Sequence, residues 1–130
     1  CANVNNLGAV LIGLVSGVLV VYSINFFEKR GLDDAVGAIS VHGICGIWGV
    51  IAVAIFDTAD GLFYGGGTSL FGPQLIGILA IGAWAYGTSF LVFKVIDSTV
   101  GLRVTAEEEI AGLDASEHGT SAYGDFITKD

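Results

Sequence analysis

Three long stretches of the chain contain no Asp, Glu, Lys or Arg, and they constrain the fold more than any other feature. They are 21, 22 and 24 residues long and cover positions 7–27, 35–56 and 70–93. The hydrocarbon core of a bilayer needs about 20 helical residues to cross. None of the stretches shows the strict alternation of a barrel strand. The sequence therefore predicts an all-α integral membrane protein with three transmembrane helices, at about 7–27, 35–56 and 70–98.

The composition supports this prediction and excludes other classes of protein. Hydrophobic residues make up 53% of the chain and charged residues 14%, and the mean hydropathy is +0.75. A soluble domain carries about 25% charged residues. A soluble helix bundle is the alternative, but the three uncharged stretches leave it no polar faces. The net charge of −8 argues against nucleic acid as a partner, because nucleic-acid binding favours a basic face.

The distribution of lysine and arginine predicts the orientation in the membrane. Loop 28–34 contains two basic residues, whereas loop 57–69 contains none. Lys94 and Arg103 follow the third apolar stretch. Because basic residues concentrate on the cytoplasmic side, we expect loop 28–34 and the C-terminus in the cytoplasm and loop 57–69 outside.

The polar C-terminal region, 103–130, follows a transmembrane region that we expect to cover residues 1–102. It holds seven acidic residues against Arg103 and Lys129. Thr105 and Glu108 have the spacing of a capping box. The sequence therefore predicts a short helix over about 106–111 that ends at Gly112. Composition alone does not distinguish a solvated acidic tail from a folded regulatory tail.

His42 is the candidate functional residue, because an ionisable group at membrane depth is seldom retained without a role. On an ideal helix its face carries mostly small residues: Ala35, Ala38, Gly46, Gly49 and Val53. Such a face lets another helix approach closely or leaves open space beside the imidazole. Neutral imidazole can accept a hydrogen bond, relay a proton or ligate a metal. A structural histidine that bonds a neighbouring helix is the alternative, and no metal site is predicted because Cys45 is the only other nearby ligand.

Two further features predict helix structure. Asp33 and Asp34 precede the middle helix, where either carboxylate could cap its free N–H groups. Gly13 and Gly17 form a GxxxG motif in the first helix, which is typical of close helix packing.

Two spacings in the chain resemble a known family, the Amt-type ammonium transporters (Amt/Mep/Rh family). The first is similar to the family's penultimate helix and reads Asp34-x-x-Gly37-x-x-x-x-His42-Gly43-x-x-Gly46-x-x-Gly49. The second resembles its C-terminal region and reads Gly101-Leu102-Arg103-Val104, Glu107-Glu108-Glu109 and Gly112-Leu113-Asp114-x-x-x-His118-Gly119. The match covers nearly the whole chain in the correct order.

The resemblance implies an eleven-helix transporter that assembles as a homotrimer with one pore per subunit. This chain would supply the last three helices, so we expect a C-terminal fragment that does not conduct alone. His42 would be the second of two pore histidines, and Asp34 a structural residue at the helix start. The glycines that would pack beside the pore are Gly43, Gly46 and Gly49. Ammonium would lose a proton near the outer mouth, and neutral ammonia would cross while the proton passes along the imidazoles.

The resemblance also implies that the protein lies in the plasma or inner membrane. It further implies a regulatory role for the tail. The residues expected to couple neighbouring subunits are Gly112, Asp114, Ser116 and His118. Ser116 lies at a position that is a phosphorylated threonine in plant members, and PII-type signalling proteins are the implied partners. Besides the transported solute we expect only membrane lipid as a ligand, with no cofactor, no metal and no enzymatic activity. A three-helix membrane anchor that presents an acidic tail is the alternative function.

Overall fold

The computed structural model describes residues 2–34 and 36–120, and within these ranges every regular element is a helix. Three helices are long and apolar enough to cross a membrane: Asn6–Lys29, Ala38–Phe56 and Phe71–Thr99. The predicted all-α fold with three membrane spans is therefore confirmed. The chain divides into two compact units, Cys1–Ala85 and Tyr86–Asp130.

The first helix, α1, covers Asn6–Lys29, slightly more than the predicted 7–27. Asn5 caps it, because the Asn5 Oδ1 atom accepts a hydrogen bond from the Gly8 N–H at 2.8 Å. The helix is followed by Gly31, whose φ of 74° is left-handed. Glycine adopts this conformation without the steric cost that other residues meet, so it ends the helix here.

The middle span consists of two different helices in succession. Residues Ala38–Ile44 form a π-helix, η1, and Cys45–Phe56 form the α-helix α2. A π-helix has i→i+5 hydrogen bonds and is rare outside single turns, which often lie at functional sites. An apolar composition is common to π-helices and α-helices, so the sequence predicts only a helix here.

The predicted start of this span at residue 35 is wrong by three residues. Gly37 has a φ of 68°, and a left-handed residue cannot continue a right-handed helix. The helix therefore begins at Ala38, and the Asp34 carboxylate accepts hydrogen bonds from its first turn. Ala35, which the sequence analysis placed on the face of His42, lies outside the described residues.

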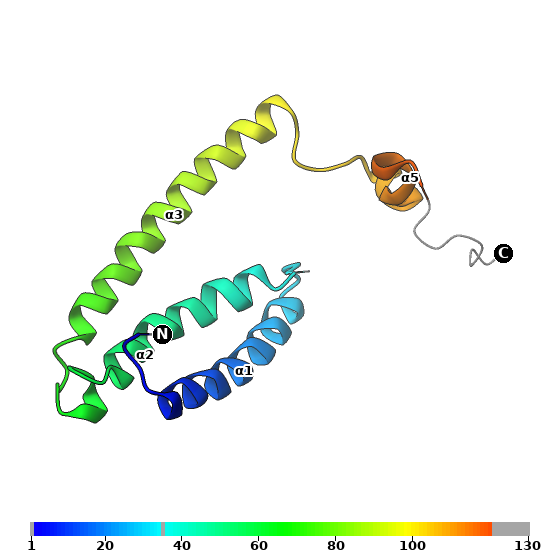
Figure 1. The fold of residues 1–130 in the computed structure, drawn as a ribbon. Helices are drawn as coiled ribbons and strands as arrows, with labels where there is room; N and C mark the ends of the chain where they lie inside the picture. Colours follow the sequence, from blue (N-terminus) through cyan, green and yellow to red (C-terminus); the bar gives the residue numbers. More distant parts are fainter. Residues whose placement is uncertain (1, 35, 121–130) are drawn as a thin grey trace. The chain divides into compact units, whose positions relative to one another are not determined.

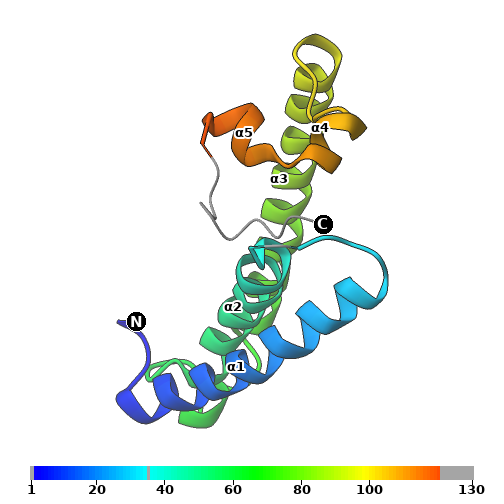
Figure 2. The same cartoon turned by 90° about the vertical axis from the view of Figure 1, so that its right-hand side faces the viewer.

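α1 and the η1–α2 segment lie side by side and run in opposite directions (Figures 1 and 2). Side chains of α2 reach α1 near its middle, and α2 buries Ala52 and Ala54 completely. Near the start of α1 the backbone comes close: a Cβ at Gly8 would lie 3.4 Å from the Phe56 ring. A Cβ at Gly13 or Gly17 would meet nothing within 4 Å among the described residues, so the predicted GxxxG contact is not made there.

Past the end of α2, Asp57 joins segments that are far apart in sequence. Its buried carboxylate accepts hydrogen bonds from Asn3 Nδ2 at 2.7 Å, Ala59 N at 2.8 Å and Asp60 N at 2.9 Å. The Thr58 N–H also donates to the Asn3 carbonyl at 2.9 Å. A short 3-10 helix, η2 (Leu62–Tyr64), follows. These bonds tie the residues before α1 to the residues after α2.

The third span, α3, covers Phe71–Thr99, one residue later at each end than predicted. Pro73 lies in its first turn, where the N–H that proline lacks would have no helical partner. At 1.5 Å per residue the helix is about 44 Å long, which exceeds the thickness of the hydrocarbon core. Its last turns carry Lys94 and Asp97, so the polar end of the helix extends beyond the uncharged stretch.

The second unit contains two short helices, α4 (Ala106–Ala111) and α5 (Leu113–His118). The predicted capping box is confirmed: Thr105 Oγ1 accepts from the Glu108 N–H, and the Glu108 carboxylate accepts from the Thr105 N–H. α4 ends at Gly112, as predicted. Positions 121–130 of the predicted tail lie outside the described residues.

Candidate functional site

His42 lies in η1, three residues before α2 begins. Its side chain is exposed and borders a groove of about 350 Å³. α2 and η1 contribute Gly43, Gly46, Ile47 and Val50 to this groove, and the first half of α3 contributes Gln74, Gly77, Ile78, Ile81 and Gly82. His42 and Gln74 are the polar side chains in a lining that is otherwise glycine and aliphatic. The groove therefore offers one imidazole and one amide in apolar surroundings.

The structure separates the glycines that the sequence analysis placed beside the histidine. Gly43 and Gly46 border the same groove as His42. Gly49 and Val53 instead border a cavity of about 520 Å³ that residues of α1 also line, among them Ile12. An ideal helical wheel groups these glycines on one face, but Gly46 and Gly49 lie three residues apart on α2 and so point about 60° apart, toward different neighbours.

Asp34 caps the helix that carries His42. Its Oδ1 accepts a hydrogen bond from the Ile39 N–H at 2.9 Å, and its Oδ2 accepts one from the Ser40 N–H at 3.0 Å. The bond from Ile39 is the main cause that holds the pKa of Asp34 below its usual range, and the Ser40 backbone bond adds to it. Asp34 is therefore ionised at neutral pH, and its oxygens are directed at the η1 backbone.

The neighbouring Asp33 occupies a different environment. Its side chain is exposed, and it borders a cavity of about 330 Å³ together with Glu28, Asp34 and aliphatic residues. The two adjacent aspartates therefore differ in what they bind, although the sequence analysis could not distinguish them.

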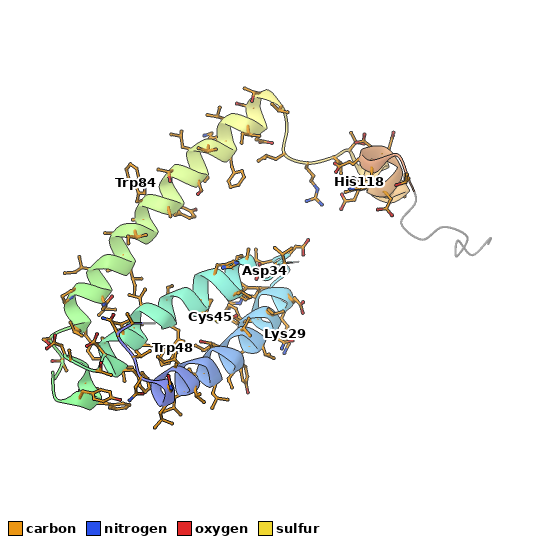
Figure 3. All side chains as sticks on the ribbon, viewed as in Figure 1. Lys29, Asp34, Cys45, Trp48, Trp84 and His118 are labelled. Atoms are coloured by element: carbon orange, nitrogen blue, oxygen red, sulfur yellow. The ribbon has the colours of Figure 1, made fainter. Side chains whose placement is uncertain are left out.

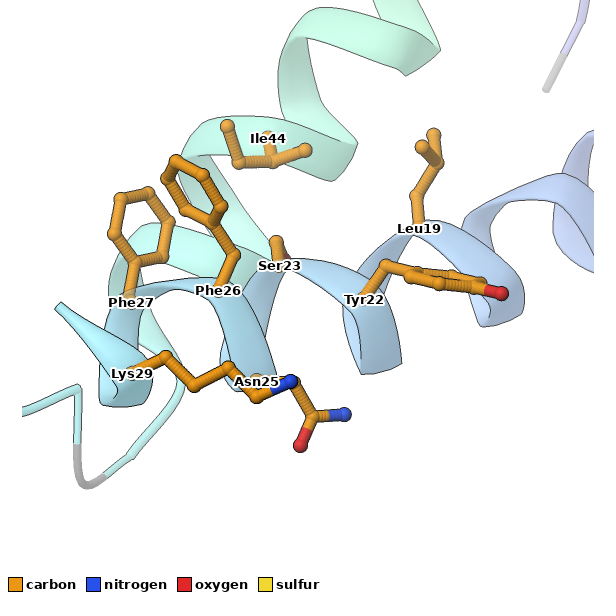
Figure 4. A pocket seen from close by; sticks show the side chains of 8 residues that line it. All are labelled: Leu19, Tyr22, Ser23, Asn25, Phe26, Phe27, Lys29 and Ile44. Atoms are coloured by element: carbon orange, nitrogen blue, oxygen red, sulfur yellow. The ribbon is translucent and has the colours of Figure 1, made fainter.

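A separate groove of about 480 Å³ lies at the C-terminal end of α1 (Figure 4). Aromatic and aliphatic side chains line most of it, with Lys29, Asn25 and Ser23 as polar members. Beside it, the Arg30 guanidinium lies 4.3 Å from the centre of the Phe26 ring. None of the candidate site residues predicted from the sequence borders this groove.

The candidate tail residues lie at the junction of α4 and α5 and along α5. Gly112 has a φ of 91° and joins the two helices, and Asp114 lies in the first turn of α5. Ser116 Oγ donates to the Leu113 carbonyl at 3.4 Å, and His118 occupies the last turn. The Thr105 backbone bond chiefly lowers the pKa of Glu108, so the capping box is charged at neutral pH. Arg103 also pairs with Glu109 at 3.0 Å, but both side chains are exposed and such pairs contribute little.

Sequence reasoning missed two contacts that hold the helix of the candidate site. The Trp48 Nε1–H donates to the Ile12 carbonyl at 3.1 Å, and the Cys45 thiol donates to the Ser16 carbonyl at 3.6 Å. An indole N–H in an apolar helix was the available signal, because a buried indole usually finds an acceptor. Its partner could not be named, because any exposed carbonyl on a neighbouring helix would serve.

Comparison with known proteins agrees with the resemblance found in the motifs. The model of the Ammonium Transporter Family matches residues 1–123. Ammonium transporter Amt2 of Archaeoglobus fulgidus is 42% identical over 139 aligned positions, which cover 98% of this chain and 30% of the relative. The ammonium transporter of Bacillus subtilis is 37% identical and ammonium transporter 1 member 1 of Arabidopsis thaliana 34% identical, over 92% and 95% of this chain.

The chain covers 31% of the Bacillus relative and 27% of the Arabidopsis relative, so it spans roughly a third of the length of the proteins it matches. The relatives are named as transport proteins, not as enzymes. The family match extends through all three membrane spans and into the tail. The chain belongs to the ammonium transporter family.

Proposed function

We propose that the chain supplies the last three membrane helices of an ammonium transporter, with His42 on the path of the solute. Family membership supports the transported solute, and the position of His42 in an apolar groove supports its role. The family match favours this function over that of a three-helix membrane anchor. The remaining helices of the transporter complete the pore, so the chain by itself does not conduct.

The single observation that carries the proposal is an imidazole beside glycine and aliphatic side chains. A bare ammonium ion enters such surroundings at a high cost in solvation free energy, whereas neutral ammonia enters readily. Ammonium therefore releases its proton near the outer mouth and crosses as ammonia. The imidazole of His42 offers one donor and one acceptor nitrogen, so it hydrogen-bonds the solute and passes the proton separately.

The proposal extends to the assembly and its surroundings. The transporter is a homotrimer in the plasma or inner membrane, its helices contact lipid, and its acidic tail lies in the cytoplasm. The basic residues of loop 28–34 support this orientation. The tail, with Gly112, Asp114, Ser116 and His118, couples neighbouring subunits and offers a surface to a PII-type signalling protein. The Ser116 side chain is exposed.

The test is the His42→Ala substitution in the full-length transporter. We expect methylammonium uptake to fall about tenfold or more, or to lose its selectivity against other cations, because an acid–base group contributes on that scale or above. Trimer assembly, measured by size-exclusion chromatography, should stay intact. Unchanged uptake with unchanged selectivity would contradict the pore role.

A further inference from the structure

Two side chains of α2 donate hydrogen bonds to backbone carbonyls of α1. Trp48 Nε1 lies 3.1 Å from the Ile12 oxygen, and Cys45 Sγ lies 3.6 Å from the Ser16 oxygen. Figure 3 shows both labelled side chains in the region where α1 and α2 face each other. The two donors are one helical turn apart, and so are the two acceptors. The contacts therefore form a matched pair between antiparallel helices.

These contacts determine register in a way that apolar packing cannot. Lipid chains are as apolar as leucine, so aliphatic contacts alone leave neighbouring helices free to slide or rotate. An indole N–H is a donor only, and leaving it without an acceptor in apolar surroundings is costly. The Ile12 carbonyl also accepts a hydrogen bond from Ser16 Oγ at 2.9 Å. The Ile12 carbonyl oxygen is therefore an acceptor at a fixed position along α1, and the Trp48 N–H binds it.

The position of these contacts along the chain links them to the candidate site. Cys45 is the first residue of α2, directly after the π-helix that carries His42. At the other end of the π-helix the Asp34 carboxylate binds the Ile39 and Ser40 N–H groups. The His42 segment is thus attached on both sides: to its own cap before it, and to α1 after it.

We propose that Trp48 is a positioning residue for His42, whose indole N–H fixes the depth and rotation of the imidazole. Cys45 supports this role more weakly, because a thiol is a weak donor. The proposal deepens the proposed function and rests on it, since the position of His42 matters for transport only if the solute passes beside it. Trp48 itself does not border the groove that holds His42.

The test is Trp48→Phe in the full-length transporter, which removes the N–H and keeps an aromatic ring. Trp84→Phe on α3 is the matched control, because Trp84 is the other of the two tryptophans and is not one of the two donors described above. The first measurement is the ¹⁵N chemical shifts of the His42 imidazole in labelled protein in nanodiscs, assigned with His42→Ala. The second is the pH profile of methylammonium uptake in intact trimers.

We expect Trp48→Phe to shift the imidazole resonances and move the pH profile, with a severalfold lower rate, while Trp84→Phe changes neither. Imidazole resonances that stay as in the wild type would overturn the proposal and show that Trp48 only packs, and so would an unchanged pH profile in a transporter whose uptake depends on His42. The imidazole resonances do not depend on transport. If they shift while His42→Ala leaves uptake intact, the proposed function fails and the attachment of His42 through Trp48 stands.

Discussion

The two ends of the α1–α2 pair are both held by an aspartate, but the two carboxylates connect different things. Asp34, before η1, binds backbone N–H groups of the helix that follows it, within six residues. Asp57, after α2, binds its own turn and also the Asn3 side chain, 54 positions away. The Asp34 end is therefore a local cap, whereas the Asp57 end joins two helices. Similar carboxylates that accept backbone hydrogen bonds can serve the geometry of a site or the stability of a fold.

Asp57→Ala should have the largest effect on stability, because it removes three hydrogen bonds at a buried position. The Asn3 side chain and two backbone N–H groups would lose their acceptor, and unsatisfied buried groups are costly. We expect the unfolding temperature of the full-length transporter in detergent to fall by several degrees. Asp60→Ala, which keeps the backbone donor and removes an exposed carboxylate, is the control. Equal melting of both variants would show that the Asp57 end does not hold the helix pair.

Gly61→Ala should disrupt the same end through the backbone. A Cβ at this buried glycine would overlap the backbone atoms of Asp57, which cannot move without breaking the turn. We expect a clear loss of thermal stability and of folded yield. Gly87→Ala in α3 is the matched control, because a Cβ there meets nothing within 4 Å among the described residues and alanine favours helix. A Gly61→Ala protein that melts like Gly87→Ala would contradict the close approach.

Asp34→Ala should affect transport more than stability, in contrast to the two substitutions at the Asp57 end. We expect a small effect on unfolding and a larger one on transport. The loss of the cap frees the N–H groups of Ile39 and Ser40 and loosens the π-helix that carries His42. We expect severalfold lower methylammonium uptake with nearly unchanged trimer stability. Asp33→Ala, at the neighbouring exposed carboxylate, is the control. If the two variants transport equally well, the Asp34 cap has no part in placing His42.

Acidification should lower the stability that the Asp34 and Asp57 carboxylates each contribute. The pKa of Asp57 lies below its usual value of 3.8, chiefly because the Asp60 N–H binds the carboxylate, with Asn3 next. The pKa of Asp34 is lowered too. A carboxylate with a lowered folded-state pKa contributes stability that is present above 3.8 and is lost as the pH falls through the folded-state value. The unfolding temperatures of the wild type and of Asp57→Asn should therefore converge as the pH falls. A difference in unfolding temperature that persists well below the folded-state pKa of Asp57 would refute this linkage.

Thr105→Ala should give the smallest effect, confined to the tail. Glu108 is a third carboxylate that accepts backbone hydrogen bonds, and with Thr105 it closes the first turn of α4. Loss of a threonine cap costs about 1 kcal/mol of helix stability. We expect faster hydrogen exchange at the Glu108 amide and no change in the unfolding of the membrane helices. Unaltered exchange would show that the capping box does not stabilise α4.

The sequence alone was sufficient for the membrane spans and for the tail helix. Uncharged stretches of at least 21 residues have few alternatives to a transmembrane helix, because lipid leaves no other partner for the backbone. The capping box and Gly112 bounded α4 correctly, because capping is decided by neighbours within four residues. The start of the middle span was placed too early, because a left-handed glycine at position 37 leaves hydropathy unchanged.

Composition and short spacings thus determined the fold class, the three spans, the family and the choice of His42. Only the tertiary structure decided that His42 lies on a π-helix, that Gly49 faces α1 while Gly46 borders the histidine groove, and that Trp48 binds the Ile12 carbonyl. The physical reason is the range of the interactions. Hydropathy and capping depend on residues close in sequence, whereas rotation and register depend on a donor meeting an acceptor on another helix.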